Sequence, residues 1–438
     1  MKIDEHPIRA LHKYLSTHIV LLAASTGFAF TRLYNPNTTN LIERISWRID
    51  DPSWVTPDFL QTTVIGQHYF GDFQLYMAWA ASDNPYSISY APTYLPFGHL
   101  LLKPLTLLPT NLAFMFFWAI SLMTLFFAVK SIVSFTAPHL NAYEILNVFL
   151  FLFVFTTSTI VDFDRGNLHT FILGLMIGGV SCYLRKNISL GVMLILVASS
   201  FKPYLFILLV LFLEKENYKE ALRKCAVYVF SSLVLYSLFQ ESASQALRST
   251  FKALSRYGNE EGIPYILQSG SFVGSISRNI EFLWGRQSAE SFLYANIFFI
   301  QAVSALLVLL GVLVWLQFSL PLAYRLFGLL SISSVAQAGS AAYQWGWLAL
   351  VILLDLTFRE EKRVAATFQK IVRIVIAFSV ICALIPVWTW IDTPAGGEMQ
   401  HPQFLVLAPL ITLLNLVFFL VGVGSFLQSK MSKKTISA

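Results

Sequence analysis

The chain has 438 residues, of which 56% are apolar and only 12% are charged, with a formal net charge of +6 at pH 7. A soluble globular domain carries about 25% charged residues and must cover itself with polar surface, so this composition excludes an ordinary soluble protein. Apart from the tail Lys430–Lys434 there is no dense basic run, which argues against a nucleic-acid surface.

Apolar runs that approach the length of a bilayer crossing recur along the chain. A crossing needs about 20 apolar residues, and fewer where neighbouring helices support a short span. The predicted spans are 15–31, 112–134, 145–161, 168–184, 188–200, 202–213, 225–239, 296–316, 326–340, 341–358, 368–388 and 404–427. The apolar segment 93–108 is interrupted by prolines and is either a span or a re-entrant piece. The predicted fold is an all-α polytopic transmembrane helical bundle of about 11–13 membrane segments, with residues 1–438 as one transmembrane domain.

Lysine and arginine residues near span ends predict the orientation, because they are enriched in cytoplasmic loops. Basic residues precede the first span and recur at 185–186, 215–224, 359–363 and 430–434. Placing them in the cytoplasm leaves two long outer loops, 32–92 and 240–295. The same orientation places 162–169 and Lys202 on the outer side.

The first outer loop holds an aspartate with an aromatic residue four positions later, Asp72 and Tyr76. These side chains share a face if the segment is helical. An Asn84-Pro85-Tyr86 turn and a Tyr94-Leu95-Pro96 stretch then lead back toward the membrane. Asp72 is interpreted as a carboxylate facing a lipid-linked substrate at the water–lipid boundary. The alternative is a solvated loop aspartate, since the same loop contains Asp50, Asp51, Asp58 and Asp83.

Two further polar segments interrupt apolar runs. Residues 162–169 read Asp-Phe-Asp-Arg-Gly-Asn-Leu-His, and ionisable groups at such depth usually have partners. An ordinary polar turn explains them equally well. Lys202 stands between two apolar segments and is interpreted as a phosphate ligand or a lysine that snorkels to a headgroup. Lys103, before Pro104, has the same ambiguity.

In their order along the chain, these segments resemble the bacterial family 87 glycosyltransferases, which have a GT-C fold and use polyprenyl-phosphate sugars. The matching pieces are Asp72 with Tyr76, Asn84-Pro85-Tyr86, Tyr94-Leu95-Pro96 with Lys103-Pro104-Leu105, Arg165-Gly166-Asn167, Phe201-Lys202-Pro203-Tyr204, and Gln268–Ser271 with Gly274 and Arg278. Two departures stand out. Gly166-Asn167 replaces the usual Gly-Gln, and Gln344 lies in a stretch where the family often has a histidine.

The resemblance implies a membrane glycosyltransferase that moves mannose or a similar hexose from a polyprenyl phosphate to a lipid- or glycan-linked acceptor. Asp72 would be the base of a single, inverting displacement, and Lys202 with Arg165 or Arg278 would stabilise the phosphate charge. The implied substrate-binding residues are Tyr76, Tyr86, Tyr94, Lys103, Arg165, Asn167, His169, Lys202, Arg278 and Gln344. The implied location is the inner (plasma) membrane of a bacterial cell, with the active site on the extracytoplasmic side.

Other functional classes share this composition. A transporter or lipid flippase could use intramembrane charges such as Lys202 and Asp162, although it would be expected to show two related halves, which the sequence lacks. A structural membrane subunit would depend on no single polar residue. The three cysteines, Cys182, Cys225 and Cys382, lie in or beside apolar stretches. They predict no disulfide framework and no metal site, and no cofactor or nucleic-acid partner is expected.

Overall fold

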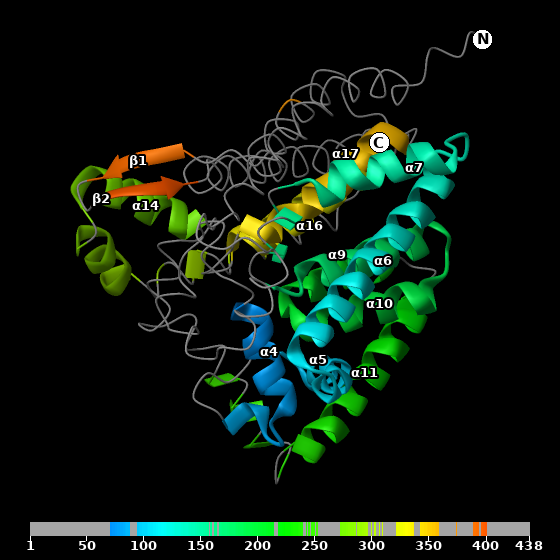
Figure 1. Cartoon of the computed structure of the whole chain (residues 1–438), viewed down its shortest axis with the longest axis horizontal. Coiled ribbons are helices and arrows are strands. Elements are labelled where there is room, and N and C mark those ends of the chain that lie inside the picture. Colours follow the sequence, from blue (N-terminus) through cyan, green and yellow to red (C-terminus); the bar gives the residue numbers. More distant parts are fainter. Residues whose placement is uncertain are drawn as a thin grey trace, which may run out of the picture. The chain divides into compact units, whose positions relative to one another are not determined.

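A computed structural model describes residues 71–87, 94–156, 166–213, 218–239, 272–285, 287–296, 321–336 and 342–358, together with 158–159, 162–163, 389–393, 396–400, scattered positions in 242–252 and 299–309, and 374. The described residues are predominantly helical (Figure 1), as predicted. The predicted spans 15–31, 368–388 and 404–427 lie wholly or almost wholly outside them, as does most of 296–316. The chain divides into two compact units, Met1–Tyr257 with Leu384–Val387, and Gly258–Ala383 with Trp388–Ala438.

Prolines divide the segment between α4 and the long helix α6 into short helices. Helix α4 (Gly71–Ala81) is followed by the short helices α5 (Pro96–Leu102) and η3 (Lys103–Leu107), and then by the long helix α6 (Thr110–Thr136). A proline opens α5, because the first helical position needs no backbone N–H donor. Pro104 and Pro109 prevent a continuous helix, so the segment 93–108 does not form a single membrane-crossing helix.

Four consecutive helical segments then run back and forth. They are α9 (His169–Leu184), α10 (Ile188–Phe201), the 3₁₀ helix η5 (Pro203–Leu213) and α11 (Tyr218–Phe239). Helices α9 and α10 match the predicted spans 168–184 and 188–200 closely, whereas α11 ends with the predicted span 225–239 but begins seven residues before it. The segment 202–213 is helical as predicted but takes the tighter 3₁₀ form. In Figure 1, α6, α9 and α10 lie alongside one another.

The contacts of Phe212 show that the chain reverses between α10 and η5. The Phe212 ring lies 5.6 Å from that of Tyr183, near the end of α9. A methyl group added at Gly191, near the start of α10, would come within 2.7 Å of the Phe212 ring. The end of η5 therefore returns to the start of α10, and the turn at the other end falls at Lys202.

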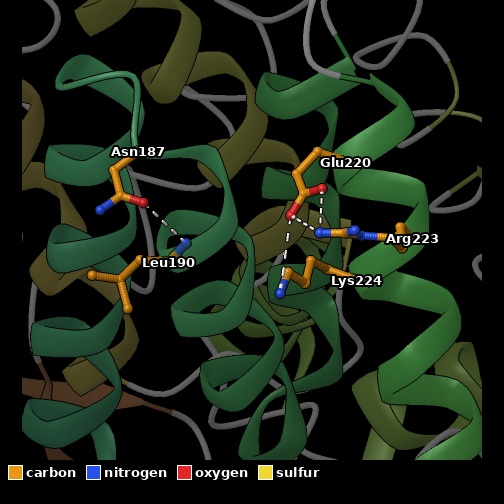
Figure 2. Close-up of polar contacts among 5 residues, drawn as sticks. All are labelled: Asn187, Leu190, Glu220, Arg223 and Lys224. Carbon is orange, nitrogen blue, oxygen red and sulfur yellow. Dashed lines mark hydrogen bonds and ion pairs between the residues drawn. The ribbon is translucent and has the colours of Figure 1, made fainter.

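One end of this unit gathers basic side chains. The Arg185 guanidinium donates a 2.7 Å hydrogen bond to the Ser131 carbonyl of α6. Figure 2 shows Asn187 capping the start of α10, and Glu220 paired with Arg223 and Lys224 in the first turns of α11. The basic end of the unit is defined here by Arg185, Lys186, Lys219, Arg223 and Lys224.

The predicted span 145–161 is not one straight helix. A capping box between Asn141 and Glu144 starts α7 (Ala142–Phe149), because each side chain satisfies the other residue's backbone N–H. A π-helical turn, η4 (Leu150–Val154), follows, and Phe155 leaves helical geometry with ψ at 48°. The chain is therefore bent before it reaches residues 162–170.

Within the part of the chain that the structure describes, two helices are long and apolar enough to cross a membrane. They are Leu112–Thr136 within α6 and Tyr218–Leu238 within α11, and the other apolar helices among the described residues are shorter. Large apolar side chains are exposed on both, including Met115 and Phe127 on α6 and Phe230 and Leu238 on α11. Such surface is costly in water and favourable in lipid. These helices and the composition indicate a membrane protein.

Helices α6 and α9 approach most closely at Gly174. A Cβ atom there would lie 2.8 Å from the backbone nitrogen of Leu125, so only glycine allows this helix separation. Gly174→Ala should therefore destabilise the protein by about 1–3 kcal/mol, measured as a lower thermal unfolding midpoint in detergent.

Gly178, one turn further along α9, provides the matched control. A Cβ atom there would meet only the Leu194 side chain, at 3.3 Å, and Ala128 at 3.9 Å. Because alanine favours the helix over glycine by about 1 kcal/mol, Gly178→Ala should leave stability unchanged or raise it. Equal effects of the two substitutions would show that the α6–α9 contact is not as close as described.

The second unit contains α14 (Phe272–Trp284), α16 (Leu322–Ala336), η7 (Ala342–Trp347) and α17 (Leu348–Thr357). Phe327 packs edge-on against Trp347, with ring centroids 6.0 Å apart.

A short hairpin in this unit is an addition to the predominantly helical fold. Strand β1 (Thr389–Thr393) pairs antiparallel with β2 (Gly396–Gln400). Three residues of β1 are β-branched, Thr389, Ile391 and Thr393, and such residues favour strands. The connection to Gly396 includes Pro394, a residue type that favours turns.

Candidate active site

Asp72, Tyr76 and Asn167 form a buried hydrogen-bonded cluster. Asp72 and Tyr76 lie one turn apart on α4, and each receives a 2.7 Å hydrogen bond from the side-chain nitrogen of Asn167. The three side chains are only 6%, 4% and 2% exposed, respectively. The prediction that Asp72 and Tyr76 share a helix face is confirmed. Asp72 is therefore not a solvated loop aspartate but a buried carboxylate held by a charge-assisted hydrogen bond.

The segment that carries Asn167 is fixed by Asp162. Its carboxylate accepts hydrogen bonds from the backbone N–H groups of His169 (3.1 Å) and Thr170 (2.6 Å) at the start of α9, where the helix itself supplies no acceptor for such donors. The Asp162 carbonyl accepts the Asn167 N–H at 2.8 Å. Gly166 has a φ of 66°, a conformation that glycine adopts without strain. Residues 162–169 were interpreted either as buried ionisable groups with partners or as an ordinary polar turn. Asp162 has the structural role of holding a turn, and that turn brings Asn167 to Asp72.

Two carboxyl groups therefore lie near each other in this region. Burial raises the pKa of the Asp162 carboxyl to about 7, the hydrogen bonds from Thr170 and His169 oppose that rise, and the Asp72 charge adds to it. A negative charge on Asp162 is favoured by the helix N-terminus that it caps, whereas a negative charge on Asp72 disfavours it.

Aromatic rings line the cluster. Tyr94 lies 5.4 Å from Tyr76, 5.5 Å from Trp79 and 5.6 Å from Phe201, measured between ring centroids. The Tyr86 hydroxyl donates to the Tyr94 carbonyl at 3.0 Å. The structure thus brings the predicted residues Tyr76, Tyr86 and Tyr94 together in one buried aromatic cluster.

His99 packs against the same aromatic rings, here called the aromatic wall (Tyr76, Tyr86 and Tyr94), and was not predicted. Its ring is 5.4 Å from that of Tyr86 and 6.1 Å from that of Tyr94, and the residue is only 1% exposed. The available signal was a histidine inside the apolar run Pro96–Leu102, because burying an ionisable group in such a run is costly.

Lys202 lies at the turn where α10 ends. Its backbone is extended, with φ −131° and ψ 90°, and its side chain is half-buried. Two residues earlier, the Ser200 carbonyl accepts a 2.7 Å hydrogen bond from the Leu95 N–H, which joins the Tyr94–Pro96 stretch to the Phe201–Tyr204 stretch. Lys202 is also close enough to His169 for an electrostatic interaction between the two side chains. The fold therefore places Lys202 at the same end of the unit as Asn167.

The comparison with protein-family models covers the middle of the chain. The model of glycosyltransferase family 87 matches residues 93–335, more than half of the chain. The chain belongs to glycosyltransferase family 87. No curated protein and no solved structure matches this family 87 glycosyltransferase. The predicted family and the predicted enzyme class are confirmed, and the transporter alternative is set aside.

The matched range contains only part of the site of this family 87 enzyme. Asn167, His169 and Lys202 fall inside it, whereas Asp72 and Tyr76 precede it. The assignment of Asp72 to the site therefore rests on its contact with Asn167.

Other predicted residues of the family 87 enzyme lie elsewhere or outside the described side chains. Lys103 forms an exposed ion pair with Asp83, with 3.9 Å between Nζ and Oδ1, a pairing of little energetic weight. Arg165 and the side chains of Arg278 and Gln344 lie outside the described part of the chain. Their predicted roles remain predictions. Within the residues that the structure describes, no group of three or more His, Cys, Asp or Glu side chains forms a metal site.

Proposed function

We propose that this family 87 enzyme transfers a hexose, mannose or a similar sugar, from a polyprenyl-phosphate donor to a hydroxyl of a lipid- or glycan-linked acceptor. The observation that carries the proposal is the buried Asp72 carboxylate, fixed by Asn167 and flanked by Tyr76. A base for an alcohol must be oriented toward the proton that it accepts. The aromatic wall of Tyr86, Tyr94 and Tyr76 supplies the apolar and stacking surface that such a donor needs.

The proposed reaction is a single inverting displacement. The acceptor oxygen attacks the anomeric carbon while its proton passes to the Asp72 carboxylate. The bond between that carbon and the phosphate oxygen breaks, and the polyprenyl phosphate leaves with the electron pair. Lys202 stabilises the charge that accumulates on the leaving phosphate, as a preorganised cation does in a site that excludes water. Arg165 and Arg278 are the other proposed phosphate ligands, and His169, Gln344 and Lys103 are the remaining proposed substrate ligands.

We further propose that the site faces the extracytoplasmic side of a bacterial plasma membrane. The basic end of the first unit lies opposite the end that contains Asn167 and Lys202, because α9 and α10 each run from one end to the other. Cytoplasmic loops are enriched in lysine and arginine. A polyprenyl-phosphate donor would then reach the site from the outer leaflet.

A reconstitution assay tests the proposed reaction. The purified protein is incubated with a radiolabelled polyprenyl-phosphate hexose and a membrane lipid extract that supplies acceptors. Label should move from the donor into a second lipid or glycan, and free polyprenyl phosphate should appear in equal amount. Transfer from a nucleotide sugar, with none from the lipid-linked sugar, would contradict the donor class.

Cysteine labelling tests the orientation. In a variant without Cys182, Cys225 and Cys382, single cysteines replace Ser244, exposed beyond the end of α11, and Lys219, at the basic end. A membrane-impermeant maleimide should label Ser244→Cys in intact cells and label Lys219→Cys only after permeabilisation. The reverse pattern would place the site in the cytoplasm.

A further inference from the structure

Asn167 was predicted to bind substrate, but its geometry suggests another role. A carboxamide nitrogen carries two hydrogens, and both are accounted for, one by Asp72 Oδ2 and one by the Tyr76 hydroxyl, each at 2.7 Å. The Asn167 nitrogen therefore has no hydrogen left to donate to a substrate. Its Oδ1 accepts no hydrogen bond from the described residues, so substrate binding through that oxygen is the alternative that an experiment must separate.

The hydrogen bond to one oxygen of Asp72 restrains the whole carboxylate. A carboxylate on a helix rotates about its terminal torsion, which has broad minima. Anchoring Oδ2 to Asn167 limits this rotation and so fixes the direction of Oδ1. Because the Tyr76 hydroxyl accepts the other N–H of the same amide, Tyr76 restrains Asn167 in turn.

Asn167 is itself held rigidly. Its backbone N–H donates to the Asp162 carbonyl at 2.8 Å, and the Gly166 N–H donates to the Phe163 carbonyl at 3.0 Å. The Phe163 ring packs against Trp118 of α6, with centroids 4.9 Å apart. Phe114, on the same helix, contacts both Phe163 (5.9 Å) and Phe73 (5.2 Å), the residue after Asp72. The aromatic face of α6 thus sets the spacing between the two partners.

We infer that Asn167 is a positioning residue that acts through Asp72, orienting its carboxylate toward the acceptor hydroxyl, rather than a substrate ligand. The inference rests on the proposed function, because it takes Asp72 as the base. Asp162 supports the same arrangement one step further away, since it holds both the Asn167 backbone and the start of α9.

Three variants in the purified full-length protein test the inference: Asn167→Ala, Asn167→Asp and the control Asn187→Ala. Asn167→Ala should lower kcat about 10- to 100-fold, the usual effect of losing a group that orients a functional side chain. The affinity for a radiolabelled polyprenyl-phosphate hexose should stay within about twofold of wild type.

Asn167→Asp keeps the side-chain shape but has no N–H donor when ionised, so it gives a second reading if the alanine variant fails to fold. It should lower kcat at least as much at neutral pH. Asn187 is the matched asparagine, since it caps α10 at the basic end (Figure 2). Asn187→Ala should leave kcat and donor affinity unchanged.

A double-mutant comparison separates this inference from the proposed function. If Asn167 acts only through Asp72, Asn167→Ala should cause no further loss of transfer in an Asp72→Asn background. Equal fold losses in both backgrounds, or donor binding at least about tenfold weaker in Asn167→Ala, would overturn the positioning role. Wild-type transfer by Asp72→Asn alone would instead overturn the proposed function.

Discussion

Replacing Asp72 by asparagine should lower sugar transfer by about 10²- to 10⁴-fold, the range that a positioned general base contributes. The amide has nearly the shape of the carboxylate and can still accept the Asn167 hydrogen bond through its oxygen, so the cluster should stay folded. It has no basic lone pair for the acceptor proton. The measurement is the initial rate of label transfer from a polyprenyl-phosphate hexose by purified protein, with folding checked by thermal unfolding in detergent.

Asp83 provides a matched control for this substitution. It follows α4 closely in the sequence, is fully exposed and pairs only loosely with Lys103 among the described residues. An exposed ion pair contributes little to stability, so Asp83→Asn should transfer sugar at the wild-type rate. If folded Asp72→Asn turned over normally, Asp72 would not be the base, and a carboxylate outside the described residues would have to be considered.

Several helices of the first unit could be predicted because a helix that crosses lipid must be a continuous run of apolar residues. An apolar run with no internal proline has little alternative to a helix in a membrane, and α6, α9 and α10 follow such runs closely. The 3₁₀ form of η5 could not be predicted, because it arises from the reversal at Lys202-Pro203 and from packing of Phe212 over Gly191. The hairpin of β1 and β2 could not be predicted from apolar runs, because its strands lie between two such runs, 368–388 and 404–427.

The site was predictable in its residue types but not in its pairings. The i, i+4 spacing of Asp72 and Tyr76 is local and can be recognised without a structure. The contact from Asn167 to Asp72 crosses 95 positions, and no local pattern encodes it.

Lys103 and Lys202 show the same limit. Both precede a proline in an apolar context, yet the fold pairs Lys103 with Asp83 at the surface and places Lys202 near His169. Trp79 carried little signal, because 15% of the chain is Phe, Trp or Tyr.

Lys202 should bind the donor phosphate, and its loss should weaken donor binding by about 10- to 100-fold. That range corresponds to the roughly 1.5–3 kcal/mol of a hydrogen bond to a charged group. The lysine lies where α10 ends and η5 begins, and irregular backbone in a membrane is tolerated mainly where protein or a cavity surrounds it. Lys202→Ala and Lys202→Gln should behave alike, because both remove the charge. Equilibrium binding of a radiolabelled polyprenyl-phosphate hexose to detergent-solubilised protein measures the effect.

Lys224 serves as the control, because it is a lysine at the opposite, basic end of the unit, 3.9 Å from Glu220 (Figure 2). Lys224→Ala should leave donor affinity unchanged, and the Lys202 variants should unfold at temperatures close to wild type. A lysine that only snorkels to a headgroup would be replaceable by arginine without loss, whereas a compact phosphate contact would tolerate the larger planar group less well. If Lys202→Ala bound the donor as tightly as wild type, the phosphate role would pass to Arg165 or Arg278, the other cations proposed for it.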